Sequence, residues 1–234
     1  MTGFRPRFWP TVTALIMVAI MVALGTWQVH RLAWKTELLA TIAARMNGPA
    51  VPLPAAIDDP AGWAFRRVDA DGRFDSAHAL WLYGRTYDGK AGIHLLVPLK
   101  RPQGDAVLVD RGFIPFETSN TLASFAPADG SVAVDGVVRQ PEGGGWFVPA
   151  NRPDKNVWYT VDIGAMSKVT GLTLAPIYVA ERAAPGATGW PAATGGTEGA
   201  GIRNEHLQYA IFWYSMAVVL AGIYLVSSWK RAPK

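Results

Sequence analysis

The chain has 234 residues, no cysteine, 22 basic residues (Lys and Arg) against 18 acidic ones (Asp and Glu), and hydrophobic residues at half of its positions. It is too apolar for a disordered protein, and the lack of cysteine excludes a disulfide scaffold, a thiolate metal site and a cysteine nucleophile. A formal charge of +4 and a pI near 9.4 would suit a nucleic-acid-binding protein, so the position of the positive charge decides its meaning.

Two runs of 23 residues each, 8–30 and 207–229, contain no charged side chain. A helix of this length is roughly 35 Å long, enough to cross the hydrocarbon core of a bilayer. We therefore expect two transmembrane helices. The alternative for the first run is a cleaved signal peptide, because Arg5 and Arg7 precede it and residues 23–25 loosely fit a cleavage site. The alternative for the second run is a buried core helix.

Five of the 22 basic residues lie in the short tails 1–7 and 230–234, which contain no acidic residue. By the positive-inside rule, both tails are expected in the cytoplasm and residues 31–206 on the far side. Because the chain does not begin with a long Arg- and Ser-rich presequence, we expect a bacterial inner membrane and a periplasmic domain. The rest of the chain then has 17 basic against 18 acidic residues, so the charge indicates lipid and no nucleic acid as a partner.

The helical pattern continues beyond the first run through residues 26–46, until Asn47-Gly48-Pro49 stops it. Short runs bounded by Gly, Pro and Asp then predict strands, and Asp162 and Gly171 delimit a predicted helix at 162–170. The predicted strands are 66–74, 79–85, 93–99, 106–113, 131–139, 157–161 and 176–180. We expect an α+β membrane protein, whose exported domain is a mainly antiparallel β-sheet or barrel with a few helices.

Two local features of the domain can be interpreted from the sequence. Residues 183–201 are rich in Gly, Ala, Pro and Thr, which predicts a flexible linker to the second span. Arg111 and Gly112 indicate a bulge near the end of a strand, at which Pro115 stops the pairing.

The sequence contains no complete catalytic motif. Residues 84–91 resemble a phosphate-binding loop, but Ala91 replaces the hydroxyl residue that such a loop needs, and a strand-like run follows where a helix is required. A hairpin turn at Asp88-Gly89 is the favoured interpretation. His78 and His94 suit structural or solvated roles, so we expect a protein that is not an enzyme.

Two histidines, His30 and His206, are expected near the outer membrane surface. An imidazole there, among apolar and aromatic side chains, could bind a haem iron. The alternative is an interfacial histidine that helps to order the start of a helix.

Five segments in order along the chain resemble the surfeit locus protein 1 family, the assembly factors of cytochrome c oxidase. They are G-T-W-Q-V-H-R-L-A-W-K from Gly25, R-R-V-D-A-D-G-R-F-D from Arg66, V-L-V-D-R-G-F-I-P from Val107, F-V-P-A-N-R-P-D-K-N-V-W-Y from Phe147 and R-N-E-H-L-Q-Y-A-I-F-W-Y from Arg203. The resemblance implies two membrane helices around an exported domain, and a role in forming the haem A centre of the catalytic subunit of the oxidase.

The family histidine linked to haem binding corresponds to His206, which the resemblance implies as the metal ligand. Asn204, Tyr209 and Trp213 are its implied neighbours in the pocket. Trp27, Gln28 and Arg31 would approach from the other helix if the spans pair, whereas His30 falls at a position without a family histidine. The implied partners are the catalytic oxidase subunit, the haem A synthesis machinery and membrane lipid. The alternative function is a scaffold that binds no haem and stabilises an oxidase intermediate.

Overall fold

The structure is a computed structural model that describes residues 3–4, 6–118, 125, 127, 130–141, 143–196 and 204–230. The chain divides into two compact units. The first contains residues 1–41 and 202–234, and the second contains residues 42–201. Each unit has its own internal contacts, and each is described separately below.

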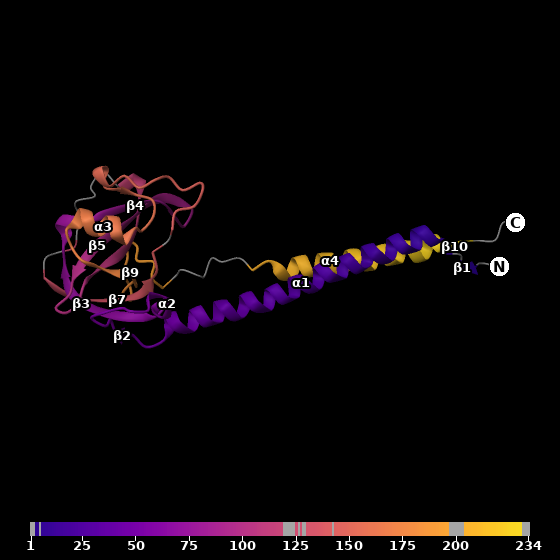
Figure 1. Ribbon diagram of the computed structural model, residues 1–234, viewed down its shortest axis with the longest axis horizontal. Helices are drawn as coiled ribbons and strands as arrows, with labels where there is room; N and C mark the ends of the chain where they lie inside the picture. The colour runs from indigo at the N-terminus through magenta and orange to yellow at the C-terminus, as the bar shows by residue number, and fades with distance from the viewer. Residues whose placement is uncertain are drawn as a thin grey trace. The chain divides into compact units, whose positions relative to one another are not determined.

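The first unit is a pair of long helices, α1 (Phe8–Asn47) and α4 (His206–Ser228), drawn in indigo and yellow in Figure 1. Their mean hydropathies of 2.0 and 1.9 make both long and apolar enough to cross a membrane. At the ends of the chain, β1 (Gly3–Phe4) pairs antiparallel with β10 (Trp229–Lys230). The predicted helical segment 26–46 is confirmed, because α1 continues without a break to Asn47.

The second unit is an eight-stranded mixed sheet with two short α-helices, α2 (Pro60–Trp63) and α3 (Ile163–Thr170). The strands follow the order β2-β3-β7-β9-β6-β5-β4-β8, and β3 also pairs with β5. Their bounds are β2 Val51–Pro52, β3 Arg67–Phe74, β4 Leu80–Tyr87, β5 Lys90–Lys100, β6 Ala106–Pro115, β7 Ser131–Arg139, β8 Val157–Trp158 and β9 Leu174–Glu181. Two 3-10 turns, Ser76–His78 and Pro153–Lys155, lie between strands.

The expected α+β class and six of the seven predicted strands are confirmed, whereas of the predicted strand 157–161 only Val157–Trp158 is a strand. The sheet is mixed, because β2–β3, β4–β8 and β6–β9 are parallel pairs. The parallel β6–β9 pair arises since β9 follows α3 and enters the sheet beside β6 in the same direction. The predicted helix is also confirmed. The Asp162 side chain accepts a hydrogen bond from the Ala165 amide at 3.0 Å, and Gly171 ends the helix with φ of 67°.

Two apolar clusters on opposite faces of the sheet form the core. Side chains of β5 alternate between them: Leu95 and Val97 belong to one cluster, and Leu96 belongs to the other. The second cluster contains Trp158 and Met166, both fully buried, so α3 covers this face. Burial on both faces explains why β5 is buried without a break from Gly92 to Leu99 and does not alternate between buried and exposed residues.

The predicted hairpin and bulge are both present. Tyr87 pairs with Lys90, and the two residues between them, Asp88 and Gly89, have φ of 49° and 73°, as in a two-residue primed turn. Because β5 continues directly from this turn, the segment has no helix that could face a phosphate. In β6, Leu95 pairs with Gly112 and Leu96 with Asp110, which leaves Arg111 as the extra residue of a bulge.

Residues 183–196 differ from the flexible linker that composition predicts. Phe113 and Ala192 exchange two backbone hydrogen bonds of 2.8 and 2.9 Å, and the Gly195 amide donates to the Glu181 carbonyl at 2.9 Å. Gly112, with φ of 121°, permits this approach, because a Cβ there would lie 2.1 Å from the Ala192 carbonyl oxygen. We call residues 183–196 the strap; the remainder of the predicted linker, 197–201, lies outside the described residues.

Candidate functional site

The α1–α4 pair meets along a seam with heptad spacing. Within residues 8–30 of α1 the less exposed positions are 11, 12, 14, 18, 21, 24, 25 and 28, and all except 12 and 24 follow alternating steps of three and four residues. On α4, positions 206, 210, 213 and 217 follow the same rule. This spacing keeps one stripe of each helix against its partner and leaves the other side chains exposed.

Polar contacts and a small residue align the two helices. The hydroxyl groups of Thr11 and Tyr224 lie 2.6 Å apart, and those of Thr26 and Tyr214 lie 3.0 Å apart. Gly25 is buried beneath the Tyr214 ring, where an added Cβ would lie 2.9 Å from a ring carbon. A small residue lets the helices approach closely, as is common where helices associate in membranes.

His206 is the first residue of α4 and lies on this seam. Its Nδ1–H donates a hydrogen bond of 2.7 Å to Oε1 of Gln28 on α1, and both side chains are half-buried. With the proton of the neutral ring on Nδ1, the lone pair lies on Nε2. A metal-binding histidine has this arrangement, in which an acceptor on one nitrogen orients the ring and leaves the other for the metal.

Asn204 lies just before α4 and also contacts α1. Its Nδ2 donates to the Thr36 hydroxyl at 3.3 Å. Its Oδ1 is buried without a hydrogen-bond partner among the described residues. A buried acceptor of this kind is costly unless another group satisfies it, so the entrance to α4 can accept a hydrogen bond from a ligand or water.

The structure separates the other expected site residues. Trp213 lies on the α4 seam two turns after His206 and is half-buried. Tyr209 (48% exposed), Trp27 (56% exposed) and Arg31 lie off the seam, and the Arg31 guanidinium instead stacks 4.1 Å from the centroid of the Trp34 ring. These three side chains are therefore available to lipid or a partner rather than turned toward His206.

His30 is exposed and does not share the face of Gln28. Residues two positions apart in a helix are separated by about 200° around its axis. His30 therefore lies on the side of α1 away from Gln28, and so away from His206. Among the described residues, no group of three or more His, Cys, Asp or Glu side chains could hold a metal ion. The candidate site therefore offers one oriented imidazole, from His206.

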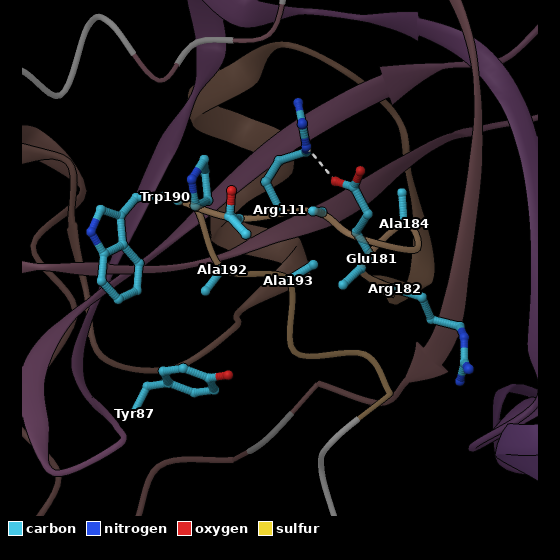
Figure 2. Close-up of a pocket in the computed structure, with 13 residues that line it drawn as sticks. Tyr87, Arg111, Glu181, Arg182, Ala184, Trp190, Ala192 and Ala193 are labelled. Atoms are coloured by element: carbon cyan, nitrogen blue, oxygen red, sulfur yellow. Dashed lines mark hydrogen bonds and ion pairs between the residues drawn. The ribbon is translucent and has the colours of Figure 1, made fainter.

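The second unit contains a separate cavity of about 550 Å³ between the strap and the ends of β6 and β9. Figure 2 shows Arg111 and Glu181 joined by an ion pair, with the rings of Tyr87 and Trp190 also lining the cavity. Burial raises the pKa of Glu181, and the Arg111 guanidinium lowers it by less. The sequence motif indicated the bulge at Arg111, but it contained no signal that Glu181, 70 residues later, is its partner.

Two histidines of this unit pair with carboxylates. Nδ1 of the buried His94 lies 2.7 Å from Asp110, whose other carboxylate oxygen accepts the Gly112 amide and supports the bulge. His78 and Lys100 both contact Asp75, at 2.9 and 2.7 Å. Burial raises the pKa of Asp75, but the hydrogen bonds from Lys100 and His78 outweigh burial, so the pKa is lowered. These contacts agree with the structural roles expected for the two histidines.

The fold and the seam define a class of protein: a mixed-sheet domain between two apolar helices that pair through a half-buried histidine. The SURF1 family profile matches residues 15–218, and the chain belongs to the SURF1 family.

Three relatives illustrate the similarity. The chain is 32% identical to Surfeit locus protein 1 of Mus musculus over 94% of this chain and 76% of the mouse protein. It is 30% identical to Surfeit locus protein 1 of Homo sapiens over 94% of this chain and 77% of that protein. It is 33% identical to a SURF1-like protein of Rickettsia conorii over 90% of this chain and 88% of that protein, which supports a bacterial member of the family.

Proposed function

We propose that this protein is a non-enzymatic assembly factor of cytochrome c oxidase, which binds haem A at the α1–α4 seam and assists its insertion into the catalytic subunit. Membership of the SURF1 family supports the assembly role. The observation that carries haem binding is the hydrogen bond of 2.7 Å between His206 and Gln28.

The residues at the seam fit a haem group. A haem iron takes its axial ligands singly, so one oriented imidazole suffices and a cluster of ligands is unnecessary. The hydrogen bond to Gln28 orients the His206 ring and leaves Nε2 for the iron. Oδ1 of Asn204, which has no hydrogen-bond partner among the described residues, adds an acceptor just before α4, and Trp213 adds an aromatic surface two turns after His206. When bound, haem A supplies the redox-active iron that the finished oxidase needs.

A half-buried histidine is a suitable ligand for transient binding, because its ring leaves the cofactor accessible to a partner. The proposed partner is the catalytic subunit of the oxidase, with the haem A synthesis machinery as the source of the cofactor. In this proposal α1 and α4 span a bacterial inner membrane, both termini are cytoplasmic, and residues 42–201 are periplasmic, as the basic tails favour.

The first test replaces His206. We expect the full-length protein, purified in detergent from cells that make haem A, to show the visible absorption bands of the cofactor, and His206→Ala to lose them because the axial ligand is gone. His30→Ala is the matched control, since His30 is exposed on the other side of α1, and it should retain wild-type haem content. Equal haem content in His206→Ala and the wild type would refute the ligand assignment and favour the scaffold that binds no haem.

The second test weakens the orientation of the ligand without removing it. Gln28→Leu keeps the size of the side chain but removes the acceptor for Nδ1 of His206, so we expect about 10- to 100-fold weaker haem binding. Gln28→Glu should retain most of the affinity, because a carboxylate accepts the same hydrogen bond. Titration of the purified apoprotein with haem, followed by absorption, measures both. Unchanged affinity in Gln28→Leu would mean that this bond does not prepare the ligand.

A further inference from the structure

Residues 143–150 form an arm between β7 and the turn Pro153–Lys155 that carries the two most exposed aromatic side chains of the described chain. Trp146 is 94% exposed and Phe147 is 98% exposed, so neither ring packs on the domain. Because aromatic rings of this size bury roughly 150–250 Å² each when they are packed, leaving both in water is unfavourable. Exposure of this extent indicates a surface that is covered in the working protein.

The backbone places both rings at the tip of the arm. The Val148 amide donates a hydrogen bond of 3.0 Å to the Gly145 carbonyl, which closes a turn with Trp146 and Phe147 as its two central residues. A Cβ added at Gly143 or Gly144 would meet no atom within 4 Å. The arm therefore stands clear of the domain on its glycine residues and presents the two rings outward.

The C-terminal end of the arm is held by hydrogen bonds to the chain that follows it. Asn151 accepts hydrogen bonds from the amides of Tyr159 and Thr160 and donates to Thr160, with distances of 2.8 to 3.2 Å. The backbones of Arg152 and Val157 are also bonded to each other. An arm that is held at this end and projects an aromatic tip is suited to insertion into another phase.

We propose that this tip inserts into the headgroup region of a phospholipid bilayer and acts as a third membrane contact of the protein. The inference rests on the proposed membrane placement of α1 and α4. The arm contains eight consecutive residues without a charged side chain, 143–150, and Trp is favoured at membrane–water interfaces. Both ends of the domain are joined covalently to apolar helices, α1 before it and α4 after it, which keeps the tip at a high effective concentration near the bilayer.

A contact of this kind would restrict how the domain turns on its two helices. It would do so without a binding pocket, since the arm needs only an apolar environment for the rings and a polar one for the Trp146 N–H. A protein surface that covers the same rings is the competing occupant, and the experiment below distinguishes the two.

The chain contains no cysteine, so one substitution gives one unique labelling site. Phe147→Cys places a nitroxide label at the tip, Val169→Cys places one on α3, where Val169 is 43% exposed, and Val218→Cys places one on α4, where Val218 is 71% exposed. Each full-length variant is inserted into phospholipid nanodiscs, and electron paramagnetic resonance measures collisions of the label with oxygen and with a water-soluble nickel complex.

We expect the labels at 147 and 218 to collide more with oxygen than with the nickel complex, as in a bilayer, and the label at 169 to show the reverse. A label at 147 that is as accessible to nickel as the label at 169, while the label at 218 is protected, would overturn the lipid contact alone. A label at 147 that loses mobility only when the catalytic oxidase subunit is added would overturn it in favour of a protein surface. A nickel-accessible label at 218 would instead refute the membrane placement of the helices.

Discussion

At the scale of residues, the chemistry of the domain depends on single positions whose partners are distant in the chain. Arg111 is the extra residue of a bulge, and this displacement brings its guanidinium to Glu181 and to within 4.9 Å of the centre of the Phe74 ring. The two charged side chains keep only 22% and 25% of their surfaces exposed. Each therefore depends on the other to offset the cost of leaving water.

Arg111→Met should destabilise the domain by roughly 1–3 kcal/mol at pH 8, less than for a fully buried pair because both side chains keep some contact with water. Without Arg111, the pKa of Glu181 rises further, since burial already raises it above the ordinary value of 4.5. A raised carboxyl pKa means that the folded state binds the proton more tightly, so stability is greatest below 4.5 and is lost as the pH rises through the folded pKa.

The difference in unfolding free energy between Arg111→Met and the wild type should therefore shrink from pH 8 to pH 4, as measured by denaturant titration at both values. Arg111→Lys is the control, because it keeps the positive charge and should lose less unfolding free energy than Arg111→Met. Asp75 provides the opposite sign: its pKa is lowered, so its contribution is present above its unfolded value and is lost as the pH falls through the folded pKa. A difference in unfolding free energy between Arg111→Met and the wild type that does not change with pH would contradict the pairing of Arg111 with Glu181.

At the scale of elements, the strap shows that a segment of low hydrophobicity can be ordered by an edge of the sheet. Its backbone bonds to Phe113, and the ring of Trp190 packs edge-on against the ring of Phe113, with centroids 5.8 Å apart. Gly112 is the residue that permits this docking, for two reasons: its positive φ and the absence of a Cβ facing Ala192.

Gly112→Ala should release the strap, because the new Cβ would lie 2.1 Å from the Ala192 carbonyl oxygen and the backbone would be strained at φ of 121°. We expect the free energy of unfolding to fall by about 1–3 kcal/mol. We also expect faster hydrogen exchange of the Phe113 amide, which in the wild type donates to the Ala192 carbonyl. Exchange measured by mass spectrometry checks this. Gly89→Ala controls for strain alone, since its φ is 73° but its Cβ would meet nothing within 4 Å. Equal protection of Phe113 in both variants would count against the docking role.

At the scale of the whole molecule, the chain consists of two compact units, one of them built from apolar helices and the other from a mixed sheet. Both buried clusters of the sheet use only residues between 51 and 190, and none of them comes from α4. The end of α1 nevertheless contributes to the domain: Met46 is 4% exposed, and its carbonyl accepts a hydrogen bond of 3.2 Å from Arg182. The last turns of α1 therefore belong to the compact unit that contains the sheet.

Residues 42–201, produced without the two spans, should fold on their own and unfold in one cooperative transition, because both clusters are complete within them. The shorter fragment 51–201 should be less stable by about 1–3 kcal/mol, since it lacks Met46 and its hydrogen bond to Arg182. Thermal unfolding followed by circular dichroism compares the two fragments. Aggregation of 42–201 without native-like unfolding would show that the helices are needed for the domain to fold.

The amino-acid sequence by itself determined the features that depend on neighbouring residues. Uncharged length specified the two apolar helices, and the helical pattern up to Asn47 specified the continuation of the first. Apolar residues and turn signals specified the six longer strands, the position of β8 and the Asp88-Gly89 hairpin, and the capping residues Asp162 and Gly171 specified α3. The short pieces β2, α2 and β10 have too few residues for a periodic signal, so the pattern did not reveal them.

Only the tertiary structure decided which distant residues meet. The parallel pairing of β6 with β9 brings Glu181 to Arg111, and pairing of the strap with β6 orders a segment whose composition predicted a linker. Of the seven residues expected around haem, His206, Gln28 and Trp213 lie on the helix seam, and Asn204 contacts Thr36 of α1. Helical phase directs Trp27, Arg31 and Tyr209 elsewhere, because a motif gives the order of residues but not the face on which a partner helix packs.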